Sequence, residues 1–379
     1  MELSVIIPTF NEEENVVKIV RELQRVLAGQ PIEYEVFFVD DSSDNTPMIL
    51  DSLSKQHKEV RYLHREGKRG LASAVVEGVG MTTGRYIIVM DADLQHPPEI
   101  VPLVALRLGN AEVVIPSRFA DGGSDGGLSL LRKMISWSAR TIGRVLIKRM
   151  RMISDCTGGF FGIRRTVIEG ILLDPVGWKI LMEILVKGNY QTVHEIPYSF
   201  SVRQDGRSKM NLREQWNYLL HIGRLVKSSP EDARFFIFCM VGMLGVFVNL
   251  LALVLLSNVV IIEPVWASIT ASFIALLHNY FLNERITWRD CNSPIIWRRV
   301  MKIPQYFSVC GLGIIITSLF VYGFVSIGLS IYCGQLVGVL VATFWSYSAN
   351  NRWTWARFQD TPKSSGKLIV TQEVPHELY

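Results

Sequence analysis

The stretch Tyr86-Ile87-Ile88-Val89-Met90-Asp91-Ala92-Asp93-Leu94-Gln95-His96 decides the fold of the first part of the chain. Its apolar run is typical of a buried β-strand, and two carboxylates and an amide follow at alternate positions, where such a strand would meet solvent. Hard oxygen ligands like those of Asp91, Asp93 and Gln95 are what Mg²⁺ or Mn²⁺ needs to hold a diphosphate. The pattern predicts a divalent-metal site at a strand end, in a chain that handles an activated nucleotide.

Strand and helix patterns alternate on both sides of this stretch. We predict strands at 3–7, 34–39, 60–63, 85–90 and 112–115, and helices at 13–27, 46–55 and 70–79. Continuous Val/Ile runs in such an alternation indicate an α/β domain with a Rossmann-like, mostly parallel sheet covered on both faces. Ligands bind beyond the carboxyl ends of these strands, and polar groups follow three of the predicted ends, at 8–12, 40–41 and 91–95.

Other phosphate-binding devices are missing from the sequence. It has no G-x-x-x-x-G-K-[ST] loop and no G-x-G-x-x-G after the first strand, so metal and cationic side chains must neutralise the diphosphate. The five cysteines show no zinc spacing. Taken alone, Asp40-Asp41 is better explained as a loop cap, but three polar strand ends at one sheet edge favour a site.

Several motifs stand in an order that resembles a known family. The segments 5–15, 39–46, 70–74 and 90–98 resemble the inverting family 2 glycosyltransferases of the GT-A fold, most of all the dolichol-phosphate (polyprenol-phosphate) mannose synthase branch. The later segments 117–119, 155–162, 177–184, 195–198 and 203–209 also fit, so the resemblance covers roughly residues 3–228. The family usually has Tyr where this chain has Phe10, which removes a hydroxyl but keeps an aromatic surface.

The resemblance implies roles for individual residues. Asp91 and Asp93, with Arg118 and Arg132, would be catalytic. Asp91, Asp93 and Gln95 would hold the metal on the diphosphate, and Asp41 would meet the base. The nucleotide sugar would contact Pro8, Phe10, Glu12, Val39, Asp41, Lys68, Ala92 and, from a mobile loop, Arg203 and Lys209.

The implied acceptor explains why no general base stands out. A sugar hydroxyl needs a base to remove its proton, whereas a polyprenyl phosphate is already an anion at neutral pH. It needs a cationic site instead, for which arginine offers bidentate geometry. Arg118, Arg132 and Ser136 match the family's acceptor-phosphate positions. A dedicated base, at Glu183 or Glu195, stays open at this point.

A basic, partly apolar segment follows the candidate acceptor residues. Residues 132–151 contain seven Lys and Arg and no Asp or Glu, with apolar residues interleaved. This composition is typical of an interfacial helix on an anionic bilayer, and 211–226 is a second candidate. The alternative is a basic helix packed on the domain. Nucleic acid is not expected as a partner, because residues 1–233 carry 29 basic and 29 acidic residues.

The second part of the chain is apolar. Residues 234–379 carry 10 basic and 6 acidic residues, so the whole net charge of +4 lies there. Apolar stretches at about 235–257, 259–282, 304–327 and 331–349 approach the ~20 residues that cross a bilayer. Basic residues gather in the connection 283–302 and in the tail, so the positive-inside rule predicts four spans in the cell membrane, with both termini and the catalytic domain in the cytoplasm.

The apolar part contains an internal repeat. Asn283-Glu284-Arg285-Ile286-Thr287-Trp288 corresponds to Asn350-Asn351-Arg352-Trp353-Thr354-Trp355, which indicates two units of two helices each. This resembles the GtrA-like four-helix membrane family, from which Glu284 departs where Asn is typical. We expect a catalytic domain at 1–210, an amphipathic juxtamembrane helix at 211–232, an all-α membrane domain of four helices at 233–357, and a polar, disordered tail at 358–379.

These inferences predict a membrane-bound, metal-dependent transfer of mannose from GDP-mannose to dolichyl or polyprenyl phosphate. A UDP-glucose-dependent polyprenyl-phosphate glucosyltransferase would share nearly all of the motifs. A protein of another class, a lipid-linked sugar translocase or scaffold with an inactive transferase half, is the third alternative. The intact set of Asp91, Asp93 and Gln95 argues against the last. For the apolar part, a simple anchor and a role in moving the lipid-linked sugar both stay open.

Overall fold

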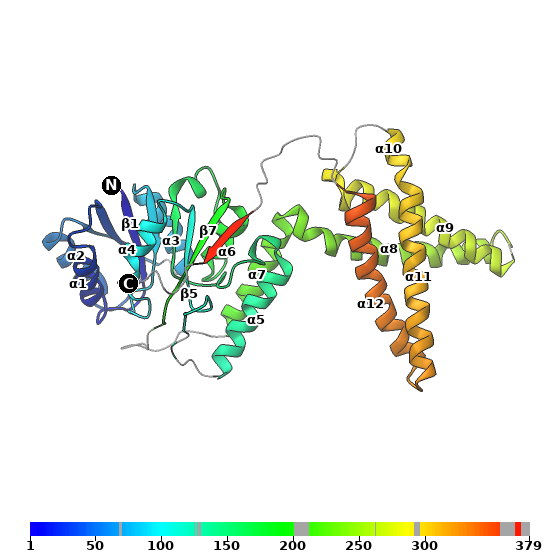
Figure 1. The fold of residues 1–379 in the computed structure, drawn as a ribbon, viewed down its shortest axis with the longest axis horizontal. Helices are drawn as coiled ribbons and strands as arrows, with labels where there is room; N and C mark the ends of the chain where they lie inside the picture. Colours follow the sequence, from blue (N-terminus) through cyan, green and yellow to red (C-terminus); the bar gives the residue numbers. More distant parts are fainter. Residues whose placement is uncertain are drawn as a thin grey trace. The chain divides into compact units, whose positions relative to one another are not determined.

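The chain divides into two units. A computed structural model describes residues 1–67, 70–124, 126, 130–200, 212–261, 263–291, 296–356 and 368–372. An N-terminal unit comprises Met1–Ser229 and Ser365–Tyr379, and a helical unit comprises Pro230–Ser364 (Figure 1). The prediction of an α/β domain followed by an all-helical apolar domain is therefore confirmed.

The N-terminal unit is built on an eight-stranded sheet of order β3-β2-β1-β4-β6-β5-β7-β8. Every described pairing is parallel except those of β6, which runs antiparallel to β4 and β5. The strands are β1 (Leu3–Thr9), β2 (Tyr34–Asp40), β3 (Val60–His64), β4 (Tyr86–Val89), β5 (Val113–Ser117), β6 (Phe161–Arg164), β7 (Thr192–Pro197) and β8 (Ile369–Gln372). The first five agree with the predicted strands to within about two residues.

Helices cover both faces of this sheet. Its α-helices are α1 (Val16–Leu27), α2 (Thr46–Gln56), α3 (Leu71–Met81), α4 (Ile100–Arg107), α5 (Leu130–Leu146), α6 (Ile180–Lys187) and α7 (Leu212–Ser228); η1 (Lys148–Met150) and η2 (Arg165–Val167) are short 3₁₀ turns. Alternate strand residues point to opposite faces, so Leu3, Val5 and Ile7 pack in one core with α1, α2 and α4. Ile6 faces α3 instead, where a Cβ on Gly78 would lie 2.7 Å from Ile6 Cγ2. Only glycine permits this close approach.

The described tail differs from its prediction. Residues Ile369–Gln372 form β8, which pairs in parallel with β7 in the register Thr192↔Ile369 to Glu195↔Gln372. The prediction of a disordered tail was wrong for these residues. An uncovered strand edge exposes a row of unpaired backbone donors and acceptors. Strand β8 provides hydrogen-bond partners for those groups on β7.

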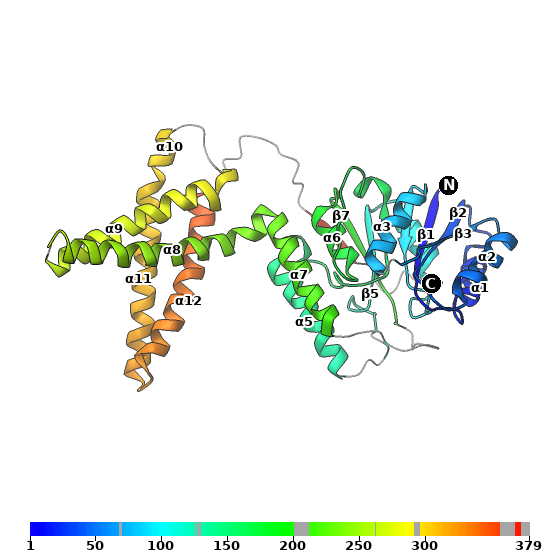
Figure 2. The same ribbon diagram turned by 180° about the vertical axis from the view of Figure 1, so that it is seen from behind.

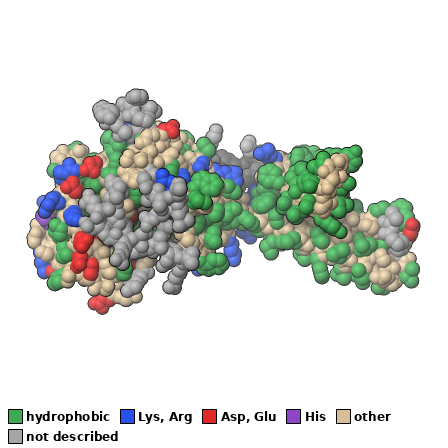
Figure 3. Space-filling view, turned by 90° about the horizontal axis from the view of Figure 1, so that it is seen from below, with side chains coloured by type: hydrophobic (Ala, Val, Ile, Leu, Met, Phe, Trp, Pro, Cys, Tyr) green, Lys and Arg blue, Asp and Glu red, His purple; other side chains and the backbone are tan. Residues whose placement is uncertain are grey.

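The helical unit consists of α8 (Pro230–Asn258), α9 (Pro264–Leu282), α10 (Ile296–Val300), α11 (Lys302–Ser326) and α12 (Ile331–Ala349), with the short turns η3 (Asn283–Thr287), η4 (Arg289–Cys291) and η5 (Asn350–Thr354). Among the described residues, three helices are long and apolar enough to cross a membrane: Pro230–Asn258, Lys302–Ser326 and Ile331–Thr354. Helix α9 lies over the remaining predicted stretch and has 19 residues. The count of four crossings stays a prediction. Hydrophobic side chains dominate this unit on the face shown in Figure 3.

The two repeats of the helical unit bind each other crosswise. Each repeat corner forms a π-helical turn, η3 or η5. Trp288 Nε1 donates to Asn351 Oδ1 at 3.0 Å, and Trp355 Nε1 donates to Glu284 Oε2. The two indoles stack with their centroids 4.2 Å apart and 3° between their planes. Each corner therefore supplies the acceptor for the tryptophan of the other.

A buried cation stands beside each corner. Lys302 Nζ lies 3.3 Å from Glu284 Oε2, and both side chains are less than a tenth exposed. In the other half, Arg234 donates to Asn351 Oδ1 at 3.1 Å and pairs with Asp290 at 2.7 Å. Glu284, the departure from the repeat, thus supplies the charge that Asp290 supplies in the other half.

Replacing Glu284 tests this arrangement. We expect Glu284→Gln to destabilise the helical unit by about 3–5 kcal/mol, because it leaves the Lys302 ammonium buried without a counter-charge. Thermal unfolding in detergent measures the effect, and Glu263→Gln, at an exposed carboxylate, is the control. The double variant Glu284→Gln/Lys302→Met should recover most of the loss. If the double variant is no more stable than the single one, the pairing contributes nothing.

Candidate active site

The predicted nucleotide residues meet at the carboxyl edge of the sheet. Pro8 of β1 lies opposite Val39 of β2 in the parallel register, and Val39 and Ala92 are buried. Phe10 and Glu12 are half-buried in the loop after β1, where the Glu12 amide donates to Thr46 Oγ1 at 3.0 Å. The structure brings these residues to one edge; their contact with a nucleotide stays a prediction.

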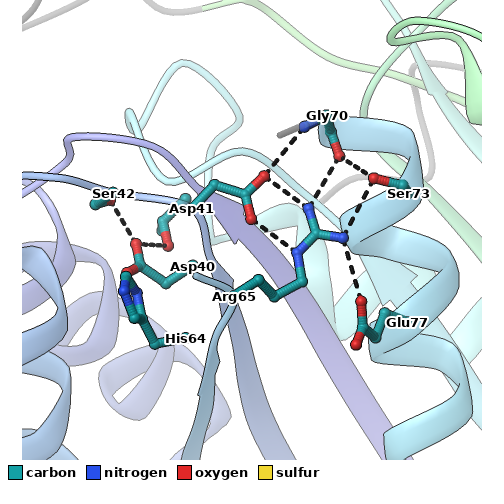
Figure 4. A network of polar contacts seen from close by, with 9 residues as sticks. Asp40, Asp41, Ser42, His64, Arg65, Gly70, Ser73 and Glu77 are labelled. Carbon is teal, nitrogen blue, oxygen red and sulfur yellow. Dashed lines mark hydrogen bonds and ion pairs between the residues drawn. The ribbon is translucent and has the colours of Figure 1, made fainter. Parts of the chain in front are cut away.

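The loop after β2 is held by Asp40 and Asp41. Asp40 is fully buried and accepts hydrogen bonds from Thr9 Oγ1 at 2.8 Å and Ser42 Oγ at 2.5 Å, while its second oxygen lies 2.7 Å from His64 Nδ1 (Figure 4). These contacts fasten the end of β2 to β1 and β3. Asp40 is therefore the structural cap that the sequence suggested for the pair.

Asp41 binds an arginine that the sequence analysis did not single out. Arg65 donates to Asp41 from Nε at 2.7 Å and from Nη2 at 2.6 Å, a bidentate pair, and the Gly70 amide donates to Asp41 at 3.1 Å (Figure 4). Gly70 has φ = +141°, a backbone conformation that favours glycine. Asp41 thereby positions the turn that begins α3, which adds a structural role to its predicted contact with the base.

Asp91 and Asp93 lie just beyond β4, as predicted. The Asp91 side chain is 37% exposed, whereas Asp93 is buried and its Oδ1 accepts from the Gln95 amide at 3.1 Å. Leu94, between Asp93 and Gln95, adopts φ = +58°, so the chain turns sharply there. His96 accepts from the Asp91 amide through Nδ1 at 3.1 Å and stacks on Phe160 with 5.2 Å between ring centroids. This contact fixes the backbone of Asp91.

The donor set suits one kind of metal. Within the part of the chain that the structure describes, no cluster of three or more His, Cys, Asp or Glu side chains could hold a metal ion. Two carboxylates and an amide form an incomplete oxygen set. Mg²⁺ and similar ions are commonly bound by one or two carboxylates together with substrate phosphates. The residues therefore fit a metal that arrives with a diphosphate and do not fit a permanent structural ion.

Arg118 is held by a residue to which the sequence analysis gave no role. Its Nε and Nη2 both lie 3.0 Å from Oδ2 of Asp155, a fully buried carboxylate in the loop before β6. That loop also approaches the metal residues, because a Cβ on Gly159 would lie 3.4 Å from Asp91 Oδ2. The signal was present in the sequence as part of the segment 155–162, which was assigned only as a family motif.

Lys179 is a second cation that the sequence analysis passed over. Its ammonium donates to the carbonyl of Thr157 at 2.8 Å, in the same loop as Asp155. Burial lowers the pKa of Lys179, while the charges of Asp155 and Asp91 act in the opposite direction. Arg118 and Lys179 thus both bind residues of this loop.

The remaining predicted residues are placed only in part. Ser136 is half-exposed on α5, the helix that also contains Arg132. The side chain of Arg132 and the whole of Lys68, Arg203 and Lys209 lie outside the described residues. The structure therefore brings Arg118 beside the metal residues and leaves the assignments of these four residues as predictions.

Both candidate bases are occupied by other contacts. Glu195 is fully buried; its Oε1 accepts from the Ser154 amide at 2.8 Å and hydroxyl at 2.7 Å, and its Oε2 accepts from Gln372 at 3.1 Å. Glu183 binds His221 at 2.9 Å and Lys187 at 2.5 Å. Burial alone would raise the pKa of Glu183, but these hydrogen bonds and one from the Asp174 amide lower it to about 2. With its pKa lowered in this way, Glu183 is a poor proton acceptor at neutral pH.

Comparison with known proteins follows the same division of the chain. Residues 4–172 match the model of glycosyl transferase family 2, and residues 237–355 match the model of the GtrA/DPMS transmembrane domain. Over 359 residues the chain is 37% identical to the dolichol-phosphate mannosyltransferase of Pyrococcus furiosus, a match that covers 94% of this chain and 100% of that protein. The chain belongs to the dolichol-phosphate mannosyltransferase family.

Two further matches cover a smaller share of the chain. The dolichol-phosphate mannosyltransferase of Saccharomyces cerevisiae is 34% identical over 239 residues, covering 59% of this chain and 87% of that protein. The crystal structure of glucosyl-3-phosphoglycerate synthase from Mycobacterium tuberculosis, with Mn²⁺, UDP and glucosyl-3-phosphoglycerate, matches with a TM-score of 0.45 and 17% identity, over 60% of this chain and 79% of that one. As a member of the dolichol-phosphate mannosyltransferase family, the chain is a glycosyltransferase with a membrane domain.

The pH dependence of stability distinguishes a structural Glu183 from a catalytic base. A pKa lowered from 4.5 to about 2, at about 1.4 kcal/mol per unit, corresponds to about 3 kcal/mol. Because the folded-state pKa is lowered, this contribution is complete above about pH 5 and is lost as the pH falls toward 2. The difference in melting temperature between the wild-type protein and Glu183→Gln should therefore be largest above pH 5 and should be smaller at pH 3.

Thermal unfolding in detergent across this pH range measures the gap, with Glu169→Gln, at an exposed carboxylate, as the control. A Glu183→Gln variant that is as stable as the wild type but has lost all transfer would instead identify Glu183 as the base.

Proposed function

We propose that this glycosyltransferase moves mannose from GDP-mannose to dolichyl or polyprenyl phosphate, with inversion at the anomeric carbon and release of GDP. The observation that carries the proposal is a pairing at one sheet edge. Asp91 and Asp93 are residues of the type that binds metals. Arg118 is oriented by Asp155, whose loop approaches Asp91 at the same edge. Full-length similarity to a dolichol-phosphate mannosyltransferase supports mannose as the sugar and a dolichyl phosphate as the acceptor.

The occupied carboxylates favour an acceptor that is already an anion. Glu183 and Glu195 are both bound by several donors, so neither is suited to deprotonate a hydroxyl. A polyprenyl phosphate oxygen attacks without losing a proton, and it needs cations that orient it. Arg118, with Arg132 and Ser136 on α5, is proposed to provide them.

On the donor side, Asp91, Asp93 and Gln95 would hold Mg²⁺ or Mn²⁺. When bound, the metal would neutralise the diphosphate leaving group. Asp41, Pro8 and Val39 would bind the nucleoside end at the neighbouring strands β1 and β2. Lys68, Arg203 and Lys209 are proposed to reach the phosphates from segments outside the described residues.

The surface of the N-terminal unit supports contact with a bilayer. Helices α5 and α7 lie side by side (Figures 1 and 2), joined by a hydrogen bond from the Tyr218 hydroxyl to the carbonyl of Ala139. Their outer faces expose Trp137 and Trp216, which are 62% and 63% exposed, and other large apolar side chains, namely Met134, Val145, Leu219 and Leu220. Tryptophans beside basic residues are typical of an interfacial surface. We propose that this surface rests on the cytoplasmic leaflet, with four spans and both termini in the cytoplasm.

A transfer assay tests the proposed reaction. Purified full-length protein is incubated with Mn²⁺, a polyprenyl phosphate and either GDP-mannose or UDP-glucose, and the lipid fraction is examined for sugar. We expect β-linked mannosyl phosphate from GDP-mannose, none from UDP-glucose, and none after chelation of the metal. Transfer from UDP-glucose alone would assign the other donor, and no product from either would refute the proposal.

A variant of Arg132 tests the acceptor side. We expect Arg132→Ala to reduce transfer by about a hundredfold, the size of a lost charged hydrogen bond, while GDP-mannose binding stays within about twofold. Isothermal titration measures donor binding. Arg164→Ala is the control, because Arg164 donates to the carbonyls of Leu108 and Gly109 away from the site. Undiminished transfer by Arg132→Ala would remove that residue from the acceptor site.

A further inference from the structure

Helix α5 places one more arginine beside the acceptor residues. The Arg140 guanidinium lies over Phe119, with Cζ 3.3 Å from the ring centroid, and its Nη1 donates to the Ser154 carbonyl at 3.3 Å. Arg118 also lies over Phe119, at 5.2 Å. The two arginines therefore share one aromatic ring, which holds their planar groups in place before any ligand binds.

The hydrogen-bonding capacity of Arg140 is not used up by the protein. Its buried Nε has no hydrogen-bond partner among the described residues. A buried donor without an acceptor is costly, and the cost is greater for a charged group. Such an atom indicates an acceptor that the described residues do not supply.

The charges around Arg140 also indicate a binding site for an anion. Arg118, Arg140 and Lys179 surround the loop that contains Asp155, the carboxylate that pairs with Arg118. Burial lowers the pKa of Arg140, and the nearby Arg118 acts in the same direction while Asp155 opposes it. These three cations outnumber the two buried carboxylates at this loop, Asp155 and Glu195, and a phosphate would balance the surplus positive charge.

We propose that Arg140 binds the phosphate of the lipid acceptor together with Arg118. This inference rests on the proposed function. Arg132, Ser136 and Arg140 are spaced four residues apart on α5, so they lie along one face of the helix, while Trp137 and Met134 are exposed on another. If the phosphate of the lipid binds on that face, its hydrocarbon chain could extend toward the exposed apolar side chains of α5.

The donor diphosphate offers the same chemistry, but its predicted metal ligands follow a different strand. Asp91 and Asp93 follow β4, whereas Arg140 contacts Phe119 and Ser154, which follow β5 and precede β6. Arg140 is therefore assigned to the acceptor, and the experiment separates the two sources.

The test compares Arg140→Met and Arg140→Lys with the wild type in purified full-length protein. Arg140→Met keeps the apolar contact with Phe119 but removes the charge. We expect it to raise the KM for polyprenyl phosphate about tenfold to a hundredfold and to leave GDP-mannose binding within about twofold. Arg140→Lys should recover part of the affinity. Arg165→Met is the matched control, since Arg165 also donates to backbone carbonyls, those of Gly84 and Val79.

Equilibrium binding of polyprenyl phosphate without donor, with polyprenol as the neutral comparison, gives a readout that needs no turnover. If the wild type transfers no sugar but still prefers the phosphate, and Arg140→Met loses that preference, the proposed reaction fails and this inference stands. An unchanged KM and unchanged phosphate preference in Arg140→Met would overturn the inference. Weaker GDP-mannose binding with unchanged acceptor affinity would overturn it too, by assigning Arg140 to the donor.

Discussion

The buried carboxylate of Asp155 is the interaction on which the basic side of the active site depends. A charge removed from water must be paired, and Asp155 is paired with Arg118 at 3.0 Å. The backbone beside Asp155 is held by Glu195, which accepts from the amide and hydroxyl of the preceding residue, Ser154. The orientation of the arginine therefore depends in part on hydrogen bonds within the buried edge of the sheet.

The single antiparallel strand explains why acidic and basic residues meet. Parallel strands place their carboxyl ends at one edge, which gathers the loops after β1, β2 and β4. Since β6 runs the other way between β4 and β5, it is the loop before this strand that reaches the same edge. The loop with Asp155 and Gly159 can therefore stand beside Asp91. Acidic residues after β4 and cations around β5 and β6 are therefore gathered at the same edge of the sheet.

Much of this arrangement could be predicted from local patterns. Val/Ile runs followed by polar residues predicted five strands and the edge where their ends meet, and the D-x-D-x-Q set lies where its position after a strand required. Contacts between distant segments could not be predicted in this way. Nothing in the run around Arg65 indicates that it binds Asp41, and Glu284 and Trp355 are 71 residues apart. Strand β8 was missed because four residues with two polar side chains give no clear periodic signal.

Strand β8 also has a consequence for how the protein is made. It follows every helix of the helical unit in the chain, yet it completes the sheet that begins with β1. During synthesis, the edge of β7 therefore stays unpaired until all of the apolar helices have left the ribosome. Glu195 receives the hydrogen bond from Gln372 only after that. The sheet of the N-terminal unit therefore begins to form before the apolar helices are made and is completed only after them.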